Sequence, residues 1–378
     1  SVELEVGQSQ ILTATSTSAA DLTFVWASSE PSVATVTQSG VVTAVSPGTA
    51  IVIASGTGSG VSGTTTVTVL GVGPGPEPGG ERMYVGSIVC AACHNSAEDG
   101  YLYDNFLLTG HPHKLKKVEN GQPPVYPFNF PGDVAVNGIN VPNPPEGFSW
   151  DDITYVIGGY YWKARFMDSE GYILTNFTDP AQNRLTQFNL WTQQWASYSP
   201  SEEGRKPYDC GACHTTGWTA TGPEGPHQDD LPGIYGTWAE PGVQCEACHG
   251  PGSNHVLTTS RFDVTVDTSS AQCGTCHFRD SQHRITVKGG FIEHHEQYDE
   301  MIAAGHRGLE CVVCHDPHKS SVFTPEASIR KECQDCHTTR QVLRPSMEHL
   351  ECIDCHMPWA VKSAVQLGPY EADVRSHI

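Results

Sequence analysis

The sequence predicts a fold in two parts: an all-β sandwich at the N-terminus, then a large loop-rich domain with short helices and a small β-hairpin region. Two observations predict this division. The first 70 residues hold short alternating apolar runs and lack Cys, His, Lys and Arg altogether. The rest of the chain carries all 14 cysteines, each within one repeated five-residue motif. We therefore expect domains at 1–70 and 83–378, joined by a mostly extended Gly/Pro-rich linker at 71–82.

Six runs in the first segment predict β-strands separated by turn residues at the intervals of a β-sandwich. The expected strands are 10–14, 22–26, 33–36, 41–45, 50–54 and 65–69. Trp26 is the expected core aromatic residue. The runs 26–36 and 40–50 closely resemble the group 2 bacterial Ig-like domain. The resemblance implies a surface-exposed module of secreted proteins that acts as a spacer, a decoration or an adhesion element, and we favour the passive spacer.

Seven copies of the pattern Cys-x-x-Cys-His organise the second part of the chain. They use every cysteine: Cys90, Cys93, Cys210, Cys213, Cys245, Cys248, Cys273, Cys276, Cys311, Cys314, Cys333, Cys336, Cys352 and Cys355. The histidines that close the motifs are His94, His214, His249, His277, His315, His337 and His356. This spacing is the attachment signature of c-type haem, in which each thiol adds to one vinyl group and the histidine binds the iron as its proximal ligand.

Zinc sites, redox-active cysteine pairs and disulfides explain this pattern less fully than haem attachment does. Zinc half-sites and thioredoxin-like pairs do not require a histidine after every pair of cysteines. A disulfide framework is possible outside the cytosol, but a Cys-x-x-Cys bridge closes almost no loop and so stabilises little. We therefore expect seven covalently attached haems c.

The composition limits the partners and the packing. Residues 83–378 contain 36 of the 42 acidic and 20 of the 21 basic residues, a net charge of −16, and the whole chain carries −21. This charge argues against binding to nucleic acid or anionic membranes and leaves basic partners, metal cations and oxide surfaces. The 296 residues of this part give about 42 residues for each expected haem, so we expect the haems to pack against one another in a continuous chain.

Haem attachment takes place outside the cytoplasmic membrane, which predicts export through the periplasm to an extracellular or cell-surface location. Ser1 begins within a strand-like pattern, so we expect that a leader has been removed from this numbering. The sequence has no run of 18 apolar residues, and we expect no transmembrane helix.

The long interval between the first two motifs predicts a β-structure of its own. The runs 152–166 and 171–175 indicate strands or a hairpin around residues 168–171. Four tryptophans lie in this interval: Trp150, Trp162, Trp191 and Trp195. Packing against haem faces is their favoured role, ahead of an electron relay.

The remaining histidines are the candidates for the sixth, distal ligand of each haem iron. Only five Met residues are present, so bis-His ligation and low reduction potentials are expected. The preferred distal ligands are His111, His255, His294, His295, His306, His318 and His349. His318 lies too close to His315 to reach the opposite face of the same haem and should bind a neighbouring one. The adjacent residues His294 and His295 should bind two different haems because their side chains diverge.

The other four histidines are expected to be exposed or to bond haem propionates. They are His113, His227, His283 and His377. His377 has a further alternative, which is to reach into a neighbouring subunit.

Four stretches resemble the multihaem c-type cytochromes of metal-reducing and syntrophic microbes. They are 110–115, 157–166, 208–218 and 242–255. That family includes extracellular cytochromes that polymerise into conductive filaments. The resemblance spans roughly residues 84–320 and matches best over the four-haem part. It implies long-range electron transfer at or beyond the cell surface, with polymerisation a feature of some relatives only.

Three hypotheses about function follow. The preferred one is an extracellular electron-transfer protein with no catalytic residue, which exchanges electrons with other redox proteins, extracellular acceptors or copies of itself in a head-to-tail homopolymer. The second is a periplasmic or surface reductase with one open catalytic haem, although the sequence has no Cys-x-x-Cys-Lys motif. The third is an adhesion or matrix protein led by the first domain. The histidines suffice to close every iron, which favours electron transfer.

Overall fold

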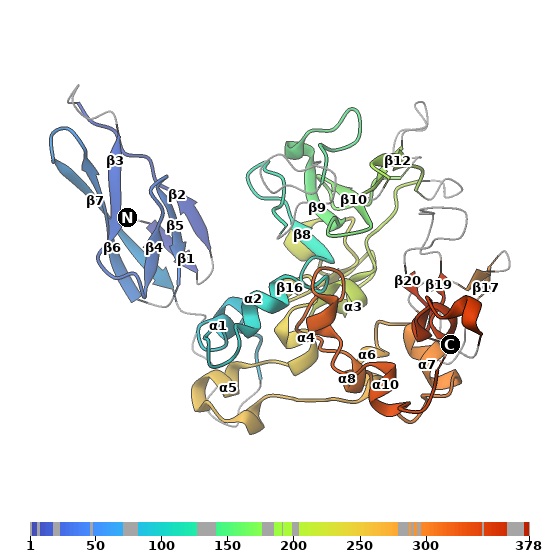
Figure 1. Cartoon of the computed structure of the whole chain (residues 1–378). Helices are drawn as coiled ribbons and strands as arrows, with labels where there is room; N and C mark the ends of the chain where they lie inside the picture. The colour runs from blue at the N-terminus through green and yellow to red at the C-terminus, as the bar shows by residue number, and fades with distance from the viewer. Residues whose placement is uncertain are drawn as a thin grey trace. The chain divides into compact units, whose positions relative to one another are not determined.

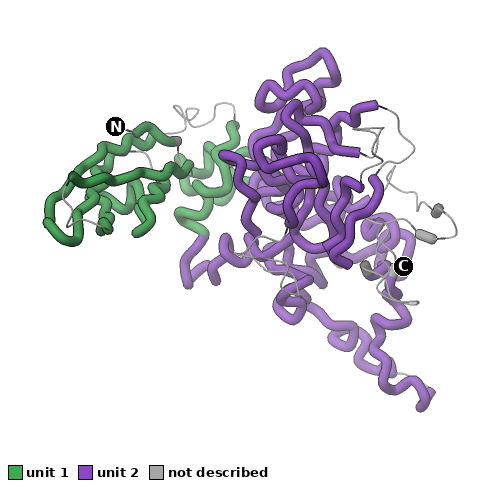
Figure 2. The backbone as a smooth tube through the Cα atoms, turned by 90° about the horizontal axis from the view of Figure 1, so that it is seen from above, with its two compact units in different colours: residues 1–94, 250–264 green, residues 95–249, 265–378 purple. Residues whose placement is uncertain are grey.

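The computed structural model describes most of the chain. The described residues are 2–5, 8–17, 23–45, 48–70, 82–126, 141–175, 185–190, 192–198, 204–278, 287–288, 291–292, 296–341, 344–360 and 374–377. They form two compact units, one of residues 1–94 with 250–264 and one of residues 95–249 with 265–378 (Figure 2). Residues 71–81 of the expected linker lie outside the described part, and the domain boundaries at 70 and 83 stay a prediction.

The N-terminal part of the first unit is a two-sheet β-sandwich (Figure 1). One sheet has the order β1-β7-β6-β3 and the other β2-β5-β4. The strands are β1 (Val2–Glu5), β2 (Ser9–Ile11), β3 (Phe24–Ser28), β4 (Ala34–Val36), β5 (Val41–Ala44), β6 (Gly48–Gly56) and β7 (Ser62–Leu70). β1 pairs with β7 in parallel, and the other pairs are antiparallel. The predicted all-β fold is thus confirmed, and β1 lies at the strand-like start of the sequence, outside the six predicted runs.

Strand alternation builds the core of the sandwich. Val42, Ala44, Ala50 and Val52 point inward and are at most 1% exposed. Trp26, the expected core aromatic residue, is partly buried and packs against this cluster. Gly40 has φ +84°, and a Cβ there would lie 3.1 Å from the Trp26 ring and 2.5 Å from the Leu12 carbonyl oxygen, so the turn before β5 requires glycine.

A five-stranded antiparallel sheet occupies the long interval between the first two motifs. Its order is β12-β11-β10-β9-β8. The strands are β8 (Leu115–Lys117), β9 (Ile153–Gly158), β10 (Lys163–Asp168), β11 (Gln187–Asn189) and β12 (Gln194–Ala196). The predicted turn at 168–171 is present, because the Asp168 N–H donates to the Tyr172 carbonyl over 2.9 Å and Met167 pairs with Ile173. The sheet is larger than the predicted hairpin region because β8, β11 and β12 extend it on both sides.

The sheet is buried on both faces. Val156, Phe166 and Leu174 belong to one apolar cluster, and Leu115 and Tyr155 belong to another. This double burial explains why β9 is apolar at most positions instead of alternating, whereas β10 keeps Lys163, Arg165 and Asp168 among its apolar residues.

Tryptophans complete the core of the sheet. The rings of Trp150 and Trp195 lie 6.0 and 5.8 Å from the ring of Phe166. Trp162 contacts Tyr161 edge to face. Trp191 lies outside the described residues. In the polypeptide, Trp150 and Trp195 therefore contribute to the core of the sheet.

Short helices, as predicted, and two-stranded ladders are found in the rest of the described residues. The helices are α1 (Ser87–Ala91), α2 (Leu102–Leu107), α3 (Gly211–His214), α4 (Cys245–His249), α5 (Ser253–Thr258), α6 (Ser270–Cys273), α7 (Gln297–Ala303), α8 (Cys311–Cys314), α9 (Pro325–Ser328), α10 (Cys333–Cys336) and α11 (Cys352–His356). The ladders pair β13 (Thr215–Thr216) with β16 (Glu240–Pro241), β14 (Thr219–Ala220) with β15 (Gly236–Thr237), β17 (Val287–Lys288) with β18 (Phe291–Ile292), and β19 (Trp359–Ala360) with β20 (Val374–Arg375). Among the described residues, no helix has the length and apolarity needed to cross a membrane.

Candidate haem-binding sites

Each cysteine motif folds into or against one short helical turn. The histidine N–H donates to the carbonyl of the first cysteine in the motifs of His94, His277, His315 and His337, over 2.8–3.0 Å. Positions i, i+3 and i+4 lie on one face of such a turn. Both thiols and the imidazole of a motif are therefore presented to the same side. None of the 14 cysteines forms a disulfide, and each is at least partly accessible.

Five of the seven motif histidines lie opposite a histidine from outside any motif. The ring-centroid distances are 6.2 Å for His94 and His255, 6.3 Å for His277 and His111, 6.2 Å for His249 and His318, 6.0 Å for His315 and His377, and 6.1 Å for His337 and His306. The first pair lies within the first unit and the other four within the second. In these five pairs the partner comes from another part of the chain: His318, three residues after His315, faces His249 instead.

These distances fit a six-coordinate iron. A metal–imidazole bond is about 2 Å long, and a ring nitrogen lies about 1 Å from its ring centre, so two axial imidazoles have centroids about 6 Å apart. The plane of each ring contains the axis through the iron, so the angle between the rings is free to vary. The observed angles run from 6° for His249 and His318 to 84° for His111 and His277. All five pairs therefore have the spacing that iron ligation requires.

Backbone carbonyls orient the rings. The Nδ1 atoms of His249, His255 and His377 lie 2.7, 2.9 and 3.2 Å from the carbonyl oxygens of Thr265, Ser260 and Arg375. His214 contacts the Lys114 carbonyl in the same way over 3.1 Å. A carbonyl only accepts, so Nδ1 carries the proton and Nε2 keeps its lone pair for a metal.

Desolvation keeps several of these imidazoles neutral. Burial, followed by the proximity of His277, lowers the pKa of His111 to about 3. Burial and the neighbouring His315 lower the pKa of His377 to about 4. Burial also lowers the pKa values of His315 and His318. The neutral form is the one that ligates iron.

The motifs of the second unit lie close to one another. The thiol of Cys213 hydrogen-bonds to that of Cys276, and the thiol of Cys273 hydrogen-bonds to that of Cys311. The Cys276 thiol also lies 3.7 Å from the Ala212 carbonyl oxygen. Helix α6, which leads into the motif of His277, contacts both α7 and α8. The motif of His277 thus lies between those of His214 and His315.

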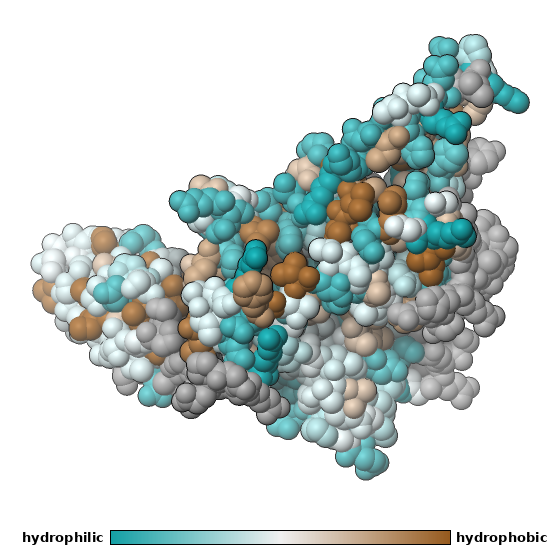
Figure 3. Space-filling view, turned by 90° about the horizontal axis from the view of Figure 1, so that it is seen from below, coloured by the Kyte–Doolittle hydropathy of each residue, from teal (hydrophilic) through white to brown (hydrophobic). Residues whose placement is uncertain are grey.

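The surface next to the motifs suits a porphyrin. Ile88, Leu257, Leu309 and Val313 lie beside motif residues or their partner histidines and are 38–52% exposed. On the face drawn in Figure 3, hydrophobic residues form separate groups among hydrophilic ones. An apolar side chain that stays accessible beside free thiols can contact the face of a haem, which is mostly apolar.

The predicted distal histidines divide into three groups. His111, His255, His306 and His318 lie opposite motif histidines. His294 and His295 lie outside the described residues, as does His283. His349 is exposed and lies near Asp354, and it is not in any of the five pairs.

Three histidines were expected to play other roles. His377 faces His315, a placement that the sequence did not favour, because it depends on a segment 21 residues beyond the last motif. His113 is buried, stacks on Tyr160 at 5.1 Å and uses Nε2 to bond the Leu107 carbonyl. His227 bonds the Ile234 carbonyl through Nδ1. Neither His113 nor His227 is in one of the five pairs.

An aromatic cluster supports the motif of His214. Trp218 stacks on Trp238 at 6.1 Å, and Tyr208 meets both rings edge to face. A Cβ at Gly211, within this motif, would lie 1.9 Å from the Trp218 ring. The ring therefore lies directly against the backbone of the motif. In the sequence, Trp218 was noted only as the last residue of the stretch 208–218, which resembles multihaem c-type cytochromes.

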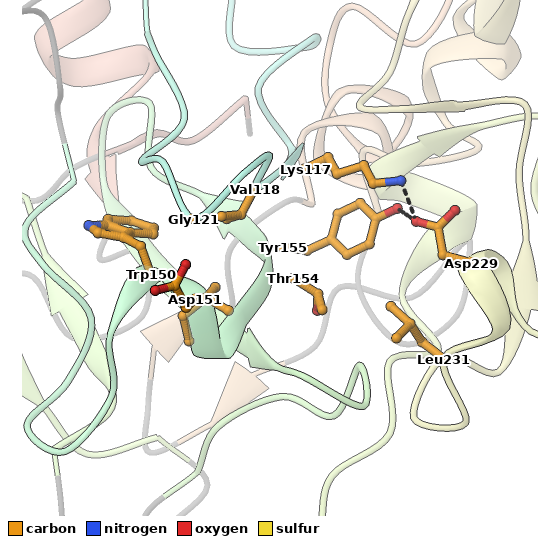
Figure 4. Close-up of a pocket in the computed structure, with 10 residues that line it drawn as sticks. Lys117, Val118, Gly121, Trp150, Asp151, Thr154, Tyr155, Asp229 and Leu231 are labelled. Atoms are coloured by element: carbon orange, nitrogen blue, oxygen red, sulfur yellow. Dashed lines mark hydrogen bonds and ion pairs between the residues drawn. The ribbon is translucent and has the colours of Figure 1, made fainter.

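A shallow hollow beside the five-stranded sheet contains a cluster of polar side chains away from the cysteine motifs (Figure 4). Lys117 Nζ lies 2.8 Å from Asp229 Oδ2, and the Tyr155 hydroxyl donates to the same oxygen over 2.5 Å. These three groups neutralise and bond one another across β8, β9 and the short 3-10 helix Gln228–Asp230. The cluster therefore has a structural role, because its three polar groups bind one another and join separate elements of the fold.

Comparison with known families gives two matches. Residues 1–69 match the bacterial Ig-like domain of group 2. Residues 181–250, which include the motifs of His214 and His249, match the family described as cytochrome c554 and c-prime. Over 134 residues the chain is 28% identical to the multiheme cytochrome MtrA of Shewanella baltica (strain OS185), covering 31% of this chain and 36% of that protein. The chain thus spans about a third of the length of this relative.

Two solved structures are similar over longer stretches. The undecaheme cytochrome from the S-layer of Carboxydothermus ferrireducens has a TM-score of 0.44 at 20% identity, covering 75% of this chain and 52% of that one. The outer cell wall cytochrome OcwA has a TM-score of 0.39 at 20% identity, covering 62% of this chain and 56% of that one.

The motifs, the family match at residues 181–250 and the curated relative support a multihaem cytochrome with haem c as its cofactor. More particularly, the first 69 residues of the chain match a group 2 bacterial Ig-like domain.

Proposed function

We propose that this chain transfers electrons through seven covalent bis-His haems c arranged as a continuous chain, at or beyond the cell surface. The observation that carries the proposal is the set of five histidine pairs at 6.0–6.3 Å. Each pair joins the histidine of one motif to a histidine from another part of the chain. The haems supply the redox chemistry, and the polypeptide sets their spacing, potential and exposure.

The closed ligand sets favour electron transfer over catalysis. An iron with two imidazole ligands has no free position at which a small substrate could bind. Imidazole on both faces also lacks the thioether sulfur that raises the potential of His/Met haems, so low potentials are expected. We assign no catalytic residue.

The close approach of the motifs supports a continuous chain in the second unit. The thiol contacts of Cys213 with Cys276 and of Cys273 with Cys311 bring three attachment sites side by side. Cys314 also lies near Cys336. Thioethers formed at neighbouring cysteines would hold the edges of their porphyrins close together, which is the condition for rapid electron exchange between them.

The assignments of location and partners follow from the chemistry of the chain. Covalent haem attachment outside the cytoplasmic membrane requires export, which supports an extracellular or cell-surface location. The net charge of −21 disfavours nucleic acid. We therefore assign as partners other redox proteins, extracellular electron acceptors and, in a head-to-tail homopolymer, copies of the chain itself. The Ig-like domain serves as a spacer.

Carbon monoxide tests the proposal against the alternative of a reductase with one open haem. Carbon monoxide binds ferrous haem only where a coordination position is open or becomes open. We expect the reduced wild-type protein to keep its spectrum under carbon monoxide and the oxidised protein to have only low-spin signals in electron paramagnetic resonance. A stoichiometric high-spin signal together with carbon monoxide binding would support the reductase instead.

A further inference from the structure

The segment Val374–His377 is fastened to the last motif although it lies well beyond it in the sequence. β20 pairs with β19, and the Ser376 N–H donates to the Pro358 carbonyl over 2.9 Å. The Arg375 guanidinium donates to the carbonyl oxygens of Ile353 and Met357 over 3.0 and 3.1 Å. These carbonyls lie in and just after α11, at the end of the helix where a cation is favourable.

Two further contacts of Arg375 fix the same segment. The guanidinium lies 3.3 Å from the Asp354 carboxylate and 4.3 Å from the centre of the Trp359 ring. Arg375 therefore binds the motif of His356 and the residues just after it in three ways: by hydrogen bonds to backbone carbonyls, by an ion pair and by a cation–π contact. Lysine could not reproduce this set.

The other end of the segment is held by α7. The His377 N–H donates to Glu300 Oε2 over 2.6 Å, and Glu300 is only 3% exposed. Burial raises the pKa of Glu300, and the hydrogen bonds from the His377 N–H and the Ser376 side chain partly oppose the rise. Helix α7 is itself tied to the motif of His277, because the Tyr298 N–H donates to the His277 carbonyl over 3.1 Å.

These contacts place the His377 ring opposite a motif histidine. Its centroid lies 6.0 Å from that of His315, with 40° between the ring planes. Nδ1 lies 3.2 Å from the Arg375 carbonyl oxygen, which leaves Nε2 as the nitrogen available for a metal. Of the five paired histidines from outside the motifs, this is the one that follows the last motif.

We propose that Val374–His377 is a coordination strap, which supplies His377 as the sixth ligand of the haem bound at His315 and is positioned by Glu300 and Arg375. The inference rests on the proposed function for the presence of a haem at that motif. It adds that the closure of this iron depends on hydrogen bonds and one ion pair to α7 and α11. Loss of these contacts would open the iron to a small exogenous ligand such as carbon monoxide or imidazole.

The decisive experiment uses the full haem-loaded chain with His377→Ala. We expect one haem equivalent to change from a low-spin to a high-spin ferric signal, and one equivalent of carbon monoxide to bind after reduction. Added imidazole should restore the low-spin signal. The matched control is His227→Ala, since His227 also bonds a backbone carbonyl but lies in none of the five pairs. An unchanged spin state and no carbon monoxide binding in His377→Ala would overturn the strap.

Two variants keep the test decisive if His377→Ala folds poorly. His377→Met offers a thioether in place of the imidazole, so we expect seven low-spin haems of which one has a raised potential. Glu300→Gln keeps an oxygen that accepts from the His377 N–H and should leave the spectra unchanged, whereas Glu300→Leu removes it and should give partial carbon monoxide binding. Equal behaviour of the two Glu300 variants would refute the positioning role.

The strap and the proposed function fail in different ways. A high-spin haem in the wild-type protein would contradict closure of every iron, whatever His377 does. A fully low-spin wild-type protein whose His377→Ala variant is also fully low-spin would contradict the strap alone.

Discussion

At the scale of single residues, the sites depend on how a histidine ring is turned as well as where it lies. The imidazole planes of His249 and His318 are 6° apart, and those of His94 and His255 are 17° apart. The planes of His111 and His277 are 84° apart. Parallel ligand planes split the two iron orbitals that overlap with the rings, and perpendicular planes leave those orbitals nearly equal in energy.

Electron paramagnetic resonance should separate these haems. We predict that parallel pairs give rhombic low-spin signals and that the perpendicular pair gives a low-spin signal with one large g value. His318→Ala should remove a rhombic component, and His111→Ala should remove the component with the large g value. Each variant is the control for the other. Loss of the same component in both variants would contradict the assignment.

Glycine within a motif provides a second test at this scale. A Cβ at Gly211 would lie 1.9 Å from the Trp218 ring, which is itself held by Trp238 and Tyr208. We predict that Gly211→Ala destabilises the protein by about 1–3 kcal/mol, the usual cost of overpacking. Thermal unfolding measures the loss. Gly308→Ala is the control, because a Cβ there meets nothing within 4 Å, and it should shift the midpoint far less.

Part of the candidate site could be predicted from the sequence because ligand chemistry is local. The Cys-x-x-Cys-His spacing predicts that both thiols and the imidazole lie on one face of a helical turn. His318 was expected to bind a different haem from His315, and in the structure it faces His249. The partner of each motif could not be predicted. His377 reaches His315 only because Glu300 and Arg375 hold its segment, and these contacts join residues far apart in the sequence. His113 resembles His111 in the sequence, but His113 stacks on Tyr160 and bonds the Leu107 carbonyl, whereas His111 faces His277.

At the scale of elements, the β-structure was the easier part to predict from the sequence. Strand alternation predicted six of the seven strands among the described residues of the first domain, and β1 falls in the strand-like start of the sequence, for which no range was predicted. The five-stranded sheet was only partly foreseen, because β8, β11 and β12 have three residues each and carry almost no pattern. The helices of the motifs are one turn long, so helical periodicity could not reveal them.

One ion pair joins three of these elements and responds to pH. Burial opposes ionisation of Asp229, but the hydrogen bonds from Lys117 and Tyr155 outweigh it and lower the pKa of Asp229. A carboxylate with a lowered folded-state pKa stabilises the fold above its unfolded value of about 3.9, and this stabilisation is lost as the pH falls through the folded-state pKa.

We predict that Asp229→Asn lowers stability at pH 7 by on the order of 1 kcal/mol, because the ion pair is partly exposed to solvent. The difference from the wild type should shrink as the pH falls below about 4, where the wild-type carboxylate also becomes neutral. Thermal midpoints between pH 3 and pH 7 test this, with Asp230→Asn as the control at the exposed neighbouring carboxylate. A difference that does not depend on pH would contradict an electrostatic origin.

At the scale of the whole molecule, much of the described part of the chain consists of very short secondary-structure elements. Outside the sandwich and the five-stranded sheet, the described helices have at most seven residues and the ladders two residues per strand. Such elements bury little apolar area on their own. The five histidine pairs each join distant parts of the sequence, so ligation across them would supply cross-links that secondary structure does not. The number of attached haems is therefore central to both the function and the folding of the molecule.

Intact-mass spectrometry of the purified, exported protein measures that number most directly. We predict a mass that exceeds that of the polypeptide by seven haem groups, with every one retained under denaturing conditions because each is bound through two thioether bonds. A mass that shows fewer than seven, or haems that dissociate on denaturation, would contradict the proposal that all seven motifs carry covalent haem.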